Sequence, residues 1–145
     1  MNRDVVHTLV AYYQGLGPDT LGALKELYAE DAWFKDPFHE FCGRDRLMDV
    51  YREMFRNLQE PRFKILQQIV DHDQAVLIWD FRFRFRGKEW CIHGSTHFGF
   101  NAEGLVVRHR DYWDAAEELY EKLPMLGALL RMIRKRIGKA GEGHG

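Results

Sequence analysis

The clearest pattern in the chain is an alternation of apolar and charged side chains between residues 77 and 86. The apolar positions are Leu77, Trp79, Phe81, Phe83 and Phe85, and the charged positions between them include Asp80, Arg82 and Arg84. Side chains of a strand point alternately to opposite faces, so this segment is predicted to be a strand with one buried face.

The next segment repeats the pattern after a turn at Gly87 and Lys88. One predicted face holds Trp90, Ile92, Gly94, Thr96 and Phe98, and the other holds Cys91, His93, Ser95 and His97. Further strands are predicted at Trp33–Asp36, from Phe63 to Ile69, and from Leu105 to Trp113, with turns at residues 71–74 and 101–104.

Elsewhere the apolar positions follow the spacing of a helix. This predicts helices from Arg3 to about Leu16, from Pro18 to about Glu30–Asp31, and from Arg44 to about Leu58. Residues 38–43 are predicted to connect the first strand to the third helix. Asp114 and Glu117 have the spacing of a helix cap, so a last helix is expected to start there.

This order of elements predicts an α+β fold. A curved antiparallel sheet would form a cone, the N-terminal helices would enclose a pocket in it, and a C-terminal helix would follow. The chain of 145 residues fits a single domain over residues 1–145. Its core would span about 3–113, and a C-terminal helical extension would span about 114–138.

Composition narrows the possible functions. The chain is 46% hydrophobic and 14% aromatic, which favours an aromatic-lined interior, and its net charge of -1 gives no general attraction to nucleic acid. The two cysteines require no disulfide, and no Cys/His set has zinc-site spacing, so no metal and no cofactor are expected. No apolar run is long enough for a membrane helix or a signal peptide, and a cytoplasmic location is expected.

Asp36 is the leading candidate for chemistry. Asp36 is the last residue of a predicted strand and is followed by Pro37. The nearby residues Trp33, Phe34 and Phe38 are apolar. A carboxylate in apolar surroundings is costly unless it is paired, hydrogen-bonded or used in chemistry. Asp36 could instead cap the turn after Pro37 or pair with Arg44.

Three short segments resemble the nuclear transport factor 2-like superfamily, in its SnoaL-like and ketosteroid isomerase-like branch. They are residues 28–32 (Tyr-Ala-Glu-Asp-Ala), Asp36-Pro37, and Gly43-Arg44-Asp45 at the start of a helix. The resemblance covers roughly Val5 to Trp113 and implies the cone fold. That superfamily includes isomerases, cyclases, dehydratases, epoxide hydrolases and binding domains without catalysis.

The resemblance also implies roles for single residues. Asp36 matches the proton-shuttling aspartate of the ketosteroid isomerases, and Tyr12 falls near their hydrogen-bond donor on the first helix. Thr96, before His97-Phe98, stands where those enzymes have a protonated aspartate. The SnoaL-like cyclases have an acid/base aspartate on the last strand, where this chain has His109 and Asp111, two apart and therefore on one face.

The predicted catalytic residues are therefore Asp36, His109, Asp111 and Tyr12. The substrate-binding residues would be Trp33, Phe38, Tyr51, Phe55, Trp79, Phe81, Thr96 and Trp113. Together they predict binding of a small hydrophobic molecule and, if the protein is an enzyme, cofactor-free isomerisation, cyclisation or dehydration by proton transfer. The alternative is a ligand-binding or accessory dimerisation module of the same fold, in which the polar residues bond one another.

Two surfaces suggest partners. His93 and His97 lie on the charged sheet face, which favours a solvated or homodimer-forming face over a metal site. The segment Met125–Lys139 has five basic residues and no acid; a helix packed over the domain is the simpler interpretation, and binding to an anionic membrane surface is the alternative.

Overall fold

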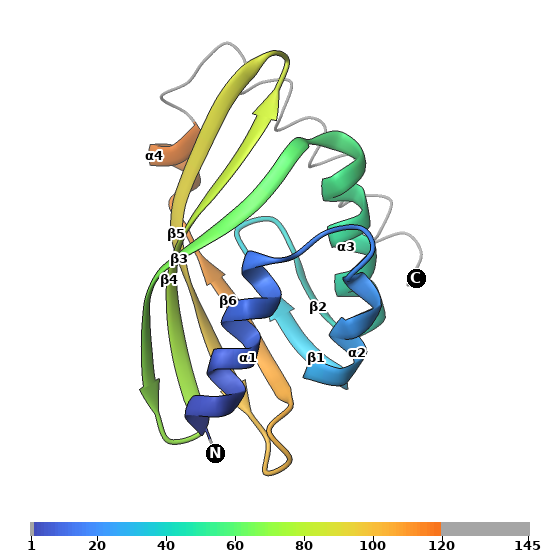
Figure 1. The fold of residues 1–145 in the computed structure, drawn as a ribbon, viewed down its shortest axis with the longest axis vertical. Coiled ribbons are helices and arrows are strands. Elements are labelled where there is room, and N and C mark those ends of the chain that lie inside the picture. The colour runs from blue at the N-terminus through green and yellow to red at the C-terminus, as the bar shows by residue number, and fades with distance from the viewer. Residues whose placement is uncertain (1, 120–145) are drawn as a thin grey trace.

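A six-stranded curved sheet with helices along one side forms the structure, a computed structural model that describes residues 2–119 (Figure 1). The expected α+β class is confirmed. The predicted extension beyond Leu119, including the basic segment 125–139, lies outside the described residues.

Of the three helices predicted before the long strands, the first and the third are present as predicted. α1 spans Asn2–Gln14 and α3 spans Arg44–Asn57. The second helix is only a 3₁₀ turn, η1 (Leu21–Ala23), followed by α2 (Leu24–Leu27). Its predicted continuation to Glu30 is wrong, because Tyr28 pairs with Val106 of another strand, and this pairing overrides the local helical propensity.

The strands are β1 (Tyr28–Lys35), β2 (Glu40–Cys42), β3 (Gln59–Asp71), β4 (Gln74–Phe85), β5 (Lys88–Phe100) and β6 (Val106–Tyr112), and α4 (Ala115–Leu119) follows them. Their order in the sheet is β2-β1-β6-β5-β4-β3. β3 to β6 form the expected antiparallel meander, but β1 pairs with β6 in parallel, so the sheet is mixed and not wholly antiparallel. Residues 38–43 are also more than a connection, because β2 lies there and pairs with β1.

The aromatic faces of β4 and β5 are buried as predicted. Trp79, Phe81 and Phe83 of β4 lie against Trp90, Ile92 and Phe98 of β5, and all are at most 8% exposed. α1 and α3 close this core on the inner side of the sheet (Figure 1). The interior around these two strands is therefore filled with packed side chains.

The other sheet face carries polar contacts. His93 Nδ1 lies 2.8 Å from Asp80 Oδ1, and His97 Nε2 lies 2.7 Å from Gln74 Oε1. Between residues 2 and 119 no group of three or more His, Cys, Asp or Glu is arranged to hold a metal ion. Pairing of two copies through this face remains a prediction. None of the helices in the described part is long and apolar enough to cross a membrane.

Gly94 creates the space that the Trp79 indole occupies. A Cβ atom at position 94 would lie 2.6 Å from Trp79 Cη2 and 3.0 Å from Trp113 Cβ. Gly94→Ala is therefore expected to lower the free energy of unfolding by about 1–3 kcal/mol, because the indole must shift in a packed core. Urea denaturation measures this.

Gly22→Ala is the matched control, since nothing lies within 4 Å of a Cβ there. It should leave stability unchanged or slightly raised. Equal stability of both variants would contradict the close approach at Gly94.

Candidate functional site

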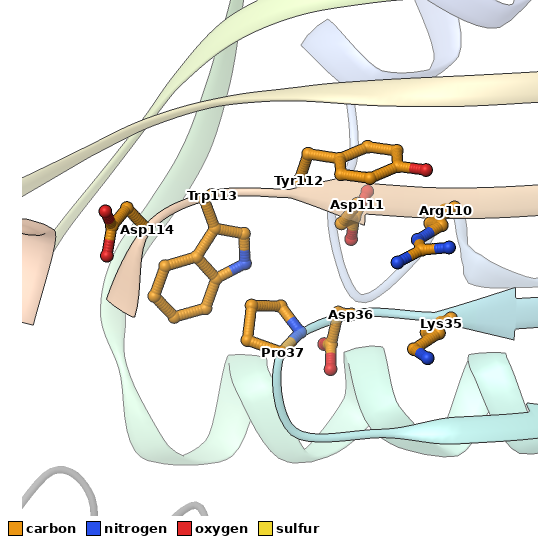
Figure 2. Close-up of a pocket in the computed structure, with 8 residues that line it drawn as sticks. All are labelled: Lys35, Asp36, Pro37, Arg110, Asp111, Tyr112, Trp113 and Asp114. Atoms are coloured by element: carbon orange, nitrogen blue, oxygen red, sulfur yellow. The ribbon is translucent and has the colours of Figure 1, made fainter. Parts of the chain in front are cut away.

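A pocket of about 500 Å³ lies where β1 and β6 separate (Figure 2). The two strands pair up to Lys35 and Arg110, and Pro37 then prevents further pairing because it has no N–H donor. The residues that line the pocket are Lys35, Asp36, Pro37, Arg110, Asp111, Tyr112, Trp113 and Asp114. The pocket therefore has charged groups beside an apolar wall.

Asp36 is held by the turn that follows it. Its Oδ1 accepts hydrogen bonds from the backbone N–H of Phe38 at 2.8 Å and of His39 at 2.6 Å. His39 Nδ1 lies 3.0 Å from both carboxylate oxygens. Figure 2 shows the Asp36 carboxylate turned away from β6. Both oxygens thus have partners within the turn, as in the capping alternative raised from the sequence.

Asp111, on β6, has a different environment. Its Oδ1 accepts a hydrogen bond from Thr96 Oγ1 at 2.6 Å and lies 2.8 Å from His109 Nε2. Thr96 Oγ1 in turn accepts from Trp79 Nε1 at 2.8 Å. Asp111 Oδ2 has no hydrogen-bond partner among residues 2–119, and the side chain remains 19% exposed at the pocket.

His109 connects Asp111 to the core. It is 2% exposed and lies among the rings of Phe34 and Phe98, at centroid distances of 4.7 and 4.9 Å. Its Nδ1 lies 2.7 Å from the Tyr28 hydroxyl. Both ring nitrogens therefore have partners, and the ring cannot rotate without breaking two buried hydrogen bonds.

Three buried tyrosines continue this chain of hydrogen bonds. The Tyr28 hydroxyl bonds that of Tyr13, which lies 2.9 Å from the Tyr51 hydroxyl. A carboxylate only accepts, so His109 Nε2–H donates to Asp111, and all three tyrosine hydroxyls can donate when Nδ1 accepts from Tyr28. Tyr13 then donates to Tyr28, and Tyr51 donates to Tyr13. Every hydroxyl hydrogen of the three tyrosines is used in this one order.

Burial keeps these tyrosines neutral. Desolvation raises the pKa of Tyr13, Tyr28 and Tyr51 well above the ordinary value of 10.0, and the nearby Asp111 charge adds to the effect. Desolvation also raises the pKa of Tyr12 to about 12. The phenols can therefore donate hydrogen bonds at neutral pH and stay protonated.

The predicted site residues fall into three groups. Asp36, Asp111 and Trp113 line the pocket, and Phe38 packs its ring against Trp113 at 5.4 Å. Tyr51, Trp79, Phe81 and Thr96 are buried in the core, and Phe55 is half-buried against it. Trp33 lies elsewhere, under the Arg108 guanidinium at 5.1 Å.

Tyr12 neighbours the chain of hydroxyl groups without joining it. Its ring packs edge-on against Tyr13 at 5.4 Å, and its buried hydroxyl has no hydrogen-bond partner in the described part of the chain. A catalytic role for Tyr12 remains a prediction.

The sequence interpretation did not include Tyr13, Tyr28 or His39 among the site residues. Tyr13 follows Val6 and Leu9 by seven and four residues, so helical spacing places it on the same buried face. That signal could have identified Tyr13. No comparable local signal marks Tyr28, whose partner His109 lies 81 residues further along the chain.

Residues 9–109 match the family model described as SnoaL-like domain. The chain therefore belongs to the SnoaL-like domain family. No curated protein matched the chain.

Solved structures of low sequence identity share the fold. A putative SnoaL-like polyketide cyclase from Shewanella putrefaciens is 16% identical, with a TM-score of 0.69 over 86% of this chain and 96% of that chain. An LEH-like epoxide hydrolase from M. tuberculosis is 16% identical, with a TM-score of 0.67 over 88% and 92%. A hypothetical protein of ketosteroid isomerase-like fold from Catenulispora acidiphila, in complex with trimethylamine, is 16% identical, with a TM-score of 0.67 over 83% and 92%.

The chain of hydroxyl groups predicts that loss of the Tyr13 hydroxyl destabilises the protein much more than loss of the Tyr12 hydroxyl. Tyr13→Phe leaves Tyr28 and Tyr51 without their shared partner, so it should lower the free energy of unfolding by about 1–3 kcal/mol. Tyr12→Phe removes a hydroxyl with no partner in the described residues and should change stability by less than about 0.5 kcal/mol. Urea denaturation of both variants measures this, and a greater loss in Tyr12→Phe would contradict the network.

The raised tyrosine pKa values predict a loss of stability in alkali. Below pH 10 these phenols are protonated in both folded and unfolded chains, so they add no pH dependence. Above pH 10 the unfolded chain loses their protons first, and stability should fall by about 1.4 kcal/mol per pH unit for each phenol that stays protonated in the fold. Denaturation between pH 9 and about pH 11 measures the slope, which Tyr13→Phe should reduce. An unchanged slope in this variant would contradict the assignment.

Proposed function

We propose that this protein catalyses a cofactor-free proton transfer on a small, largely apolar molecule bound in the pocket between β1 and β6, with Asp111 as the acid/base. The observation that supports this is the unequal environment of its two oxygens. Oδ1 is fixed by Thr96 and His109, whereas Oδ2 has no partner among residues 2–119 and belongs to a pocket-lining side chain.

The proposed step uses Oδ2 as the proton acceptor. Oδ2 removes a proton from a carbon or oxygen of the substrate, and Asp111 becomes a neutral carboxylic acid. It then returns the proton to a second position of the rearranged substrate. Isomerisation, cyclisation and dehydration include such a step. In epoxide hydration Oδ2 would instead take the proton from the water that attacks the epoxide carbon, and the proton would go to the oxygen of the opened ring. Carboxylates are suited to such proton transfers when the surrounding groups hold them in one orientation.

The residues behind Asp111 position it. His109 Nε2–H and the Thr96 hydroxyl fix Oδ1, and Tyr28 fixes the tautomer and orientation of His109. Asp36, which the ketosteroid isomerase resemblance suggested as the base, would use its bonds to Phe38 and His39 to shape the pocket wall.

The test compares two isosteric variants, Asp111→Asn and Asp36→Asn, in an activity screen with enone, epoxide and polyketide-like substrates. For any substrate that the wild type turns over, Asp111→Asn should lower kcat by at least about 100-fold, because the general base is removed. Asp36→Asn should have a smaller effect. NMR detection of deuterium exchange from solvent into the substrate gives the rate of the proton transfer itself.

A larger loss of kcat in Asp36→Asn than in Asp111→Asn would identify Asp36 as the base, as the ketosteroid isomerase resemblance implies. Full turnover in Asp111→Asn would reject Asp111 altogether. Circular dichroism spectra of both variants establish that each one is folded.

Ligand binding without turnover is the second candidate function. It is favoured by the fact that both nitrogens of His109 and both oxygens of Asp36 have partners within the protein. It predicts ligands that protect the protein against thermal unfolding, with no solvent deuterium entering the bound molecule. Exchange that depends on Asp111 would exclude it.

A further inference from the structure

Arg110 brings to the pocket a positive charge that has no hydrogen-bond acceptor among residues 2–119. The side chain is half-buried, lines the pocket, and stacks its guanidinium on the Tyr112 ring at 4.6 Å. In the part of the chain from residue 2 to residue 119, no carboxylate or carbonyl oxygen accepts a hydrogen bond from it. A guanidinium has five N–H donors, and these are therefore available to a bound molecule.

The other charged groups of the pocket already have partners. Lys35 Nζ lies 3.4 Å from Glu40, and Asp36 is bonded within its own turn. Asp114 Oδ1 accepts the backbone N–H of Glu117 at 3.2 Å. Among the described lining residues, the guanidinium of Arg110 and Oδ2 of Asp111 therefore remain for a ligand.

We infer that the substrate of this pocket carries a carboxylate group, which Arg110 binds, next to an apolar body. This inference rests on the proposed function, because it assigns the substrate class of the same pocket. The planar fork of a guanidinium matches the two oxygens of a carboxylate. Figure 2 shows the Arg110 guanidinium directed into the gap between β6 and β1, toward Lys35 and Asp36.

The apolar body has a surface to rest on. Pro37 and Trp113 line the pocket, and the Trp113 ring is supported by Phe38 at 5.4 Å. Arg110 and Asp111 are neighbours in β6 whose side chains leave opposite faces of the strand, and both residues line the one pocket of about 500 Å³ at the sheet opening, a size that suits a molecule of one or two rings. The bound acid would thus place its neighbouring atoms near the proposed base.

The pocket favours a single negative charge over two. Three carboxylates, those of Asp36, Asp111 and Asp114, also line it, and like charges repel a bound anion. A monoanionic carboxylate meets less repulsion than a dianionic phosphate ester of the same ring system. We therefore assign an aromatic or alicyclic carboxylic acid, and not a phosphate ester.

Binding of matched probes tests this assignment on the full chain. Isothermal titration and NMR would compare 2-naphthoate, 2-naphthamide and 2-naphthyl phosphate, which differ in charge on one ring system. Wild type should bind 2-naphthoate at least about tenfold more tightly than 2-naphthamide, because a hydrogen bond between two charged groups is strong. It should bind 2-naphthyl phosphate more weakly than 2-naphthoate.

Arg110→Gln should lose this preference for the carboxylate. Arg108→Gln is the matched control, because Arg108 lies on the same strand two residues earlier, stacks on Trp33, and does not line the pocket. It removes the same charge and should leave the preference intact. An equal loss in both variants would show a general charge effect and overturn the inference.

The result also separates this inference from the proposed function. Equal affinity of wild type and Arg110→Gln for 2-naphthoate, or no binding by wild type, overturns the carboxylate assignment even if Asp111→Asn abolishes turnover. Conversely, an Arg110-dependent preference together with full turnover in Asp111→Asn would keep the carboxylate site and reject Asp111 as the base. Tighter binding of the phosphate would also overturn the assignment.

Discussion

The hydrogen bond between His109 Nε2 and Asp111 Oδ1, 2.8 Å long, links the core of this protein to its pocket. On one side of it, His109 is 2% exposed and is bonded to Tyr28, whose hydroxyl is linked in turn to those of Tyr13 and Tyr51. On the other side, the Asp111 carboxylate meets the pocket. A buried polar group without a partner costs about 1–3 kcal/mol, so the core stabilises one tautomer and one orientation of the ring. The position of the proposed base is therefore set by the buried polar groups behind it.

The fold brings these groups together through strand pairing. β1 carries Tyr28 and β6 carries His109 and Asp111, and the two strands pair in parallel although β2 to β5 and α3 lie between them in the sequence. The pairing stops at Pro37, and the pocket forms where the strands separate. The point where β1 and β6 stop pairing thus brings together the Asp111 carboxylate, the Arg110 guanidinium and the apolar wall of Pro37 and Trp113. Membership of the SnoaL-like domain family agrees with this architecture. The solved structures that are about 16% identical to this chain support the fold and nothing beyond it.

Local patterns predicted the fold well where the signal was periodic. Alternation identified β4 and β5 and their buried faces, and the two-residue spacing of His109 and Asp111 correctly placed them on one face of β6. Three-residue β2 and the parallel pairing of β1 had no periodic signal, and the end of α2 was decided by tertiary pairing. The tyrosine network joins residues that are 15, 38 and 81 positions apart, so it depends on the folded geometry and could not be inferred from spacing.

The most direct test is the tautomer of His109, measured by long-range ¹H–¹⁵N NMR at neutral pH and assigned with a His109→Gln variant. A single ring proton, carried by Nε2, satisfies the whole network, because Asp111 Oδ1 only accepts and an acceptor Nδ1 lets all three tyrosine hydroxyls donate. We therefore predict one resolved Nε2–H tautomer, which Asp111→Asn perturbs. A proton on Nδ1, or the averaged signals of a solvent-exposed imidazole, would contradict the account.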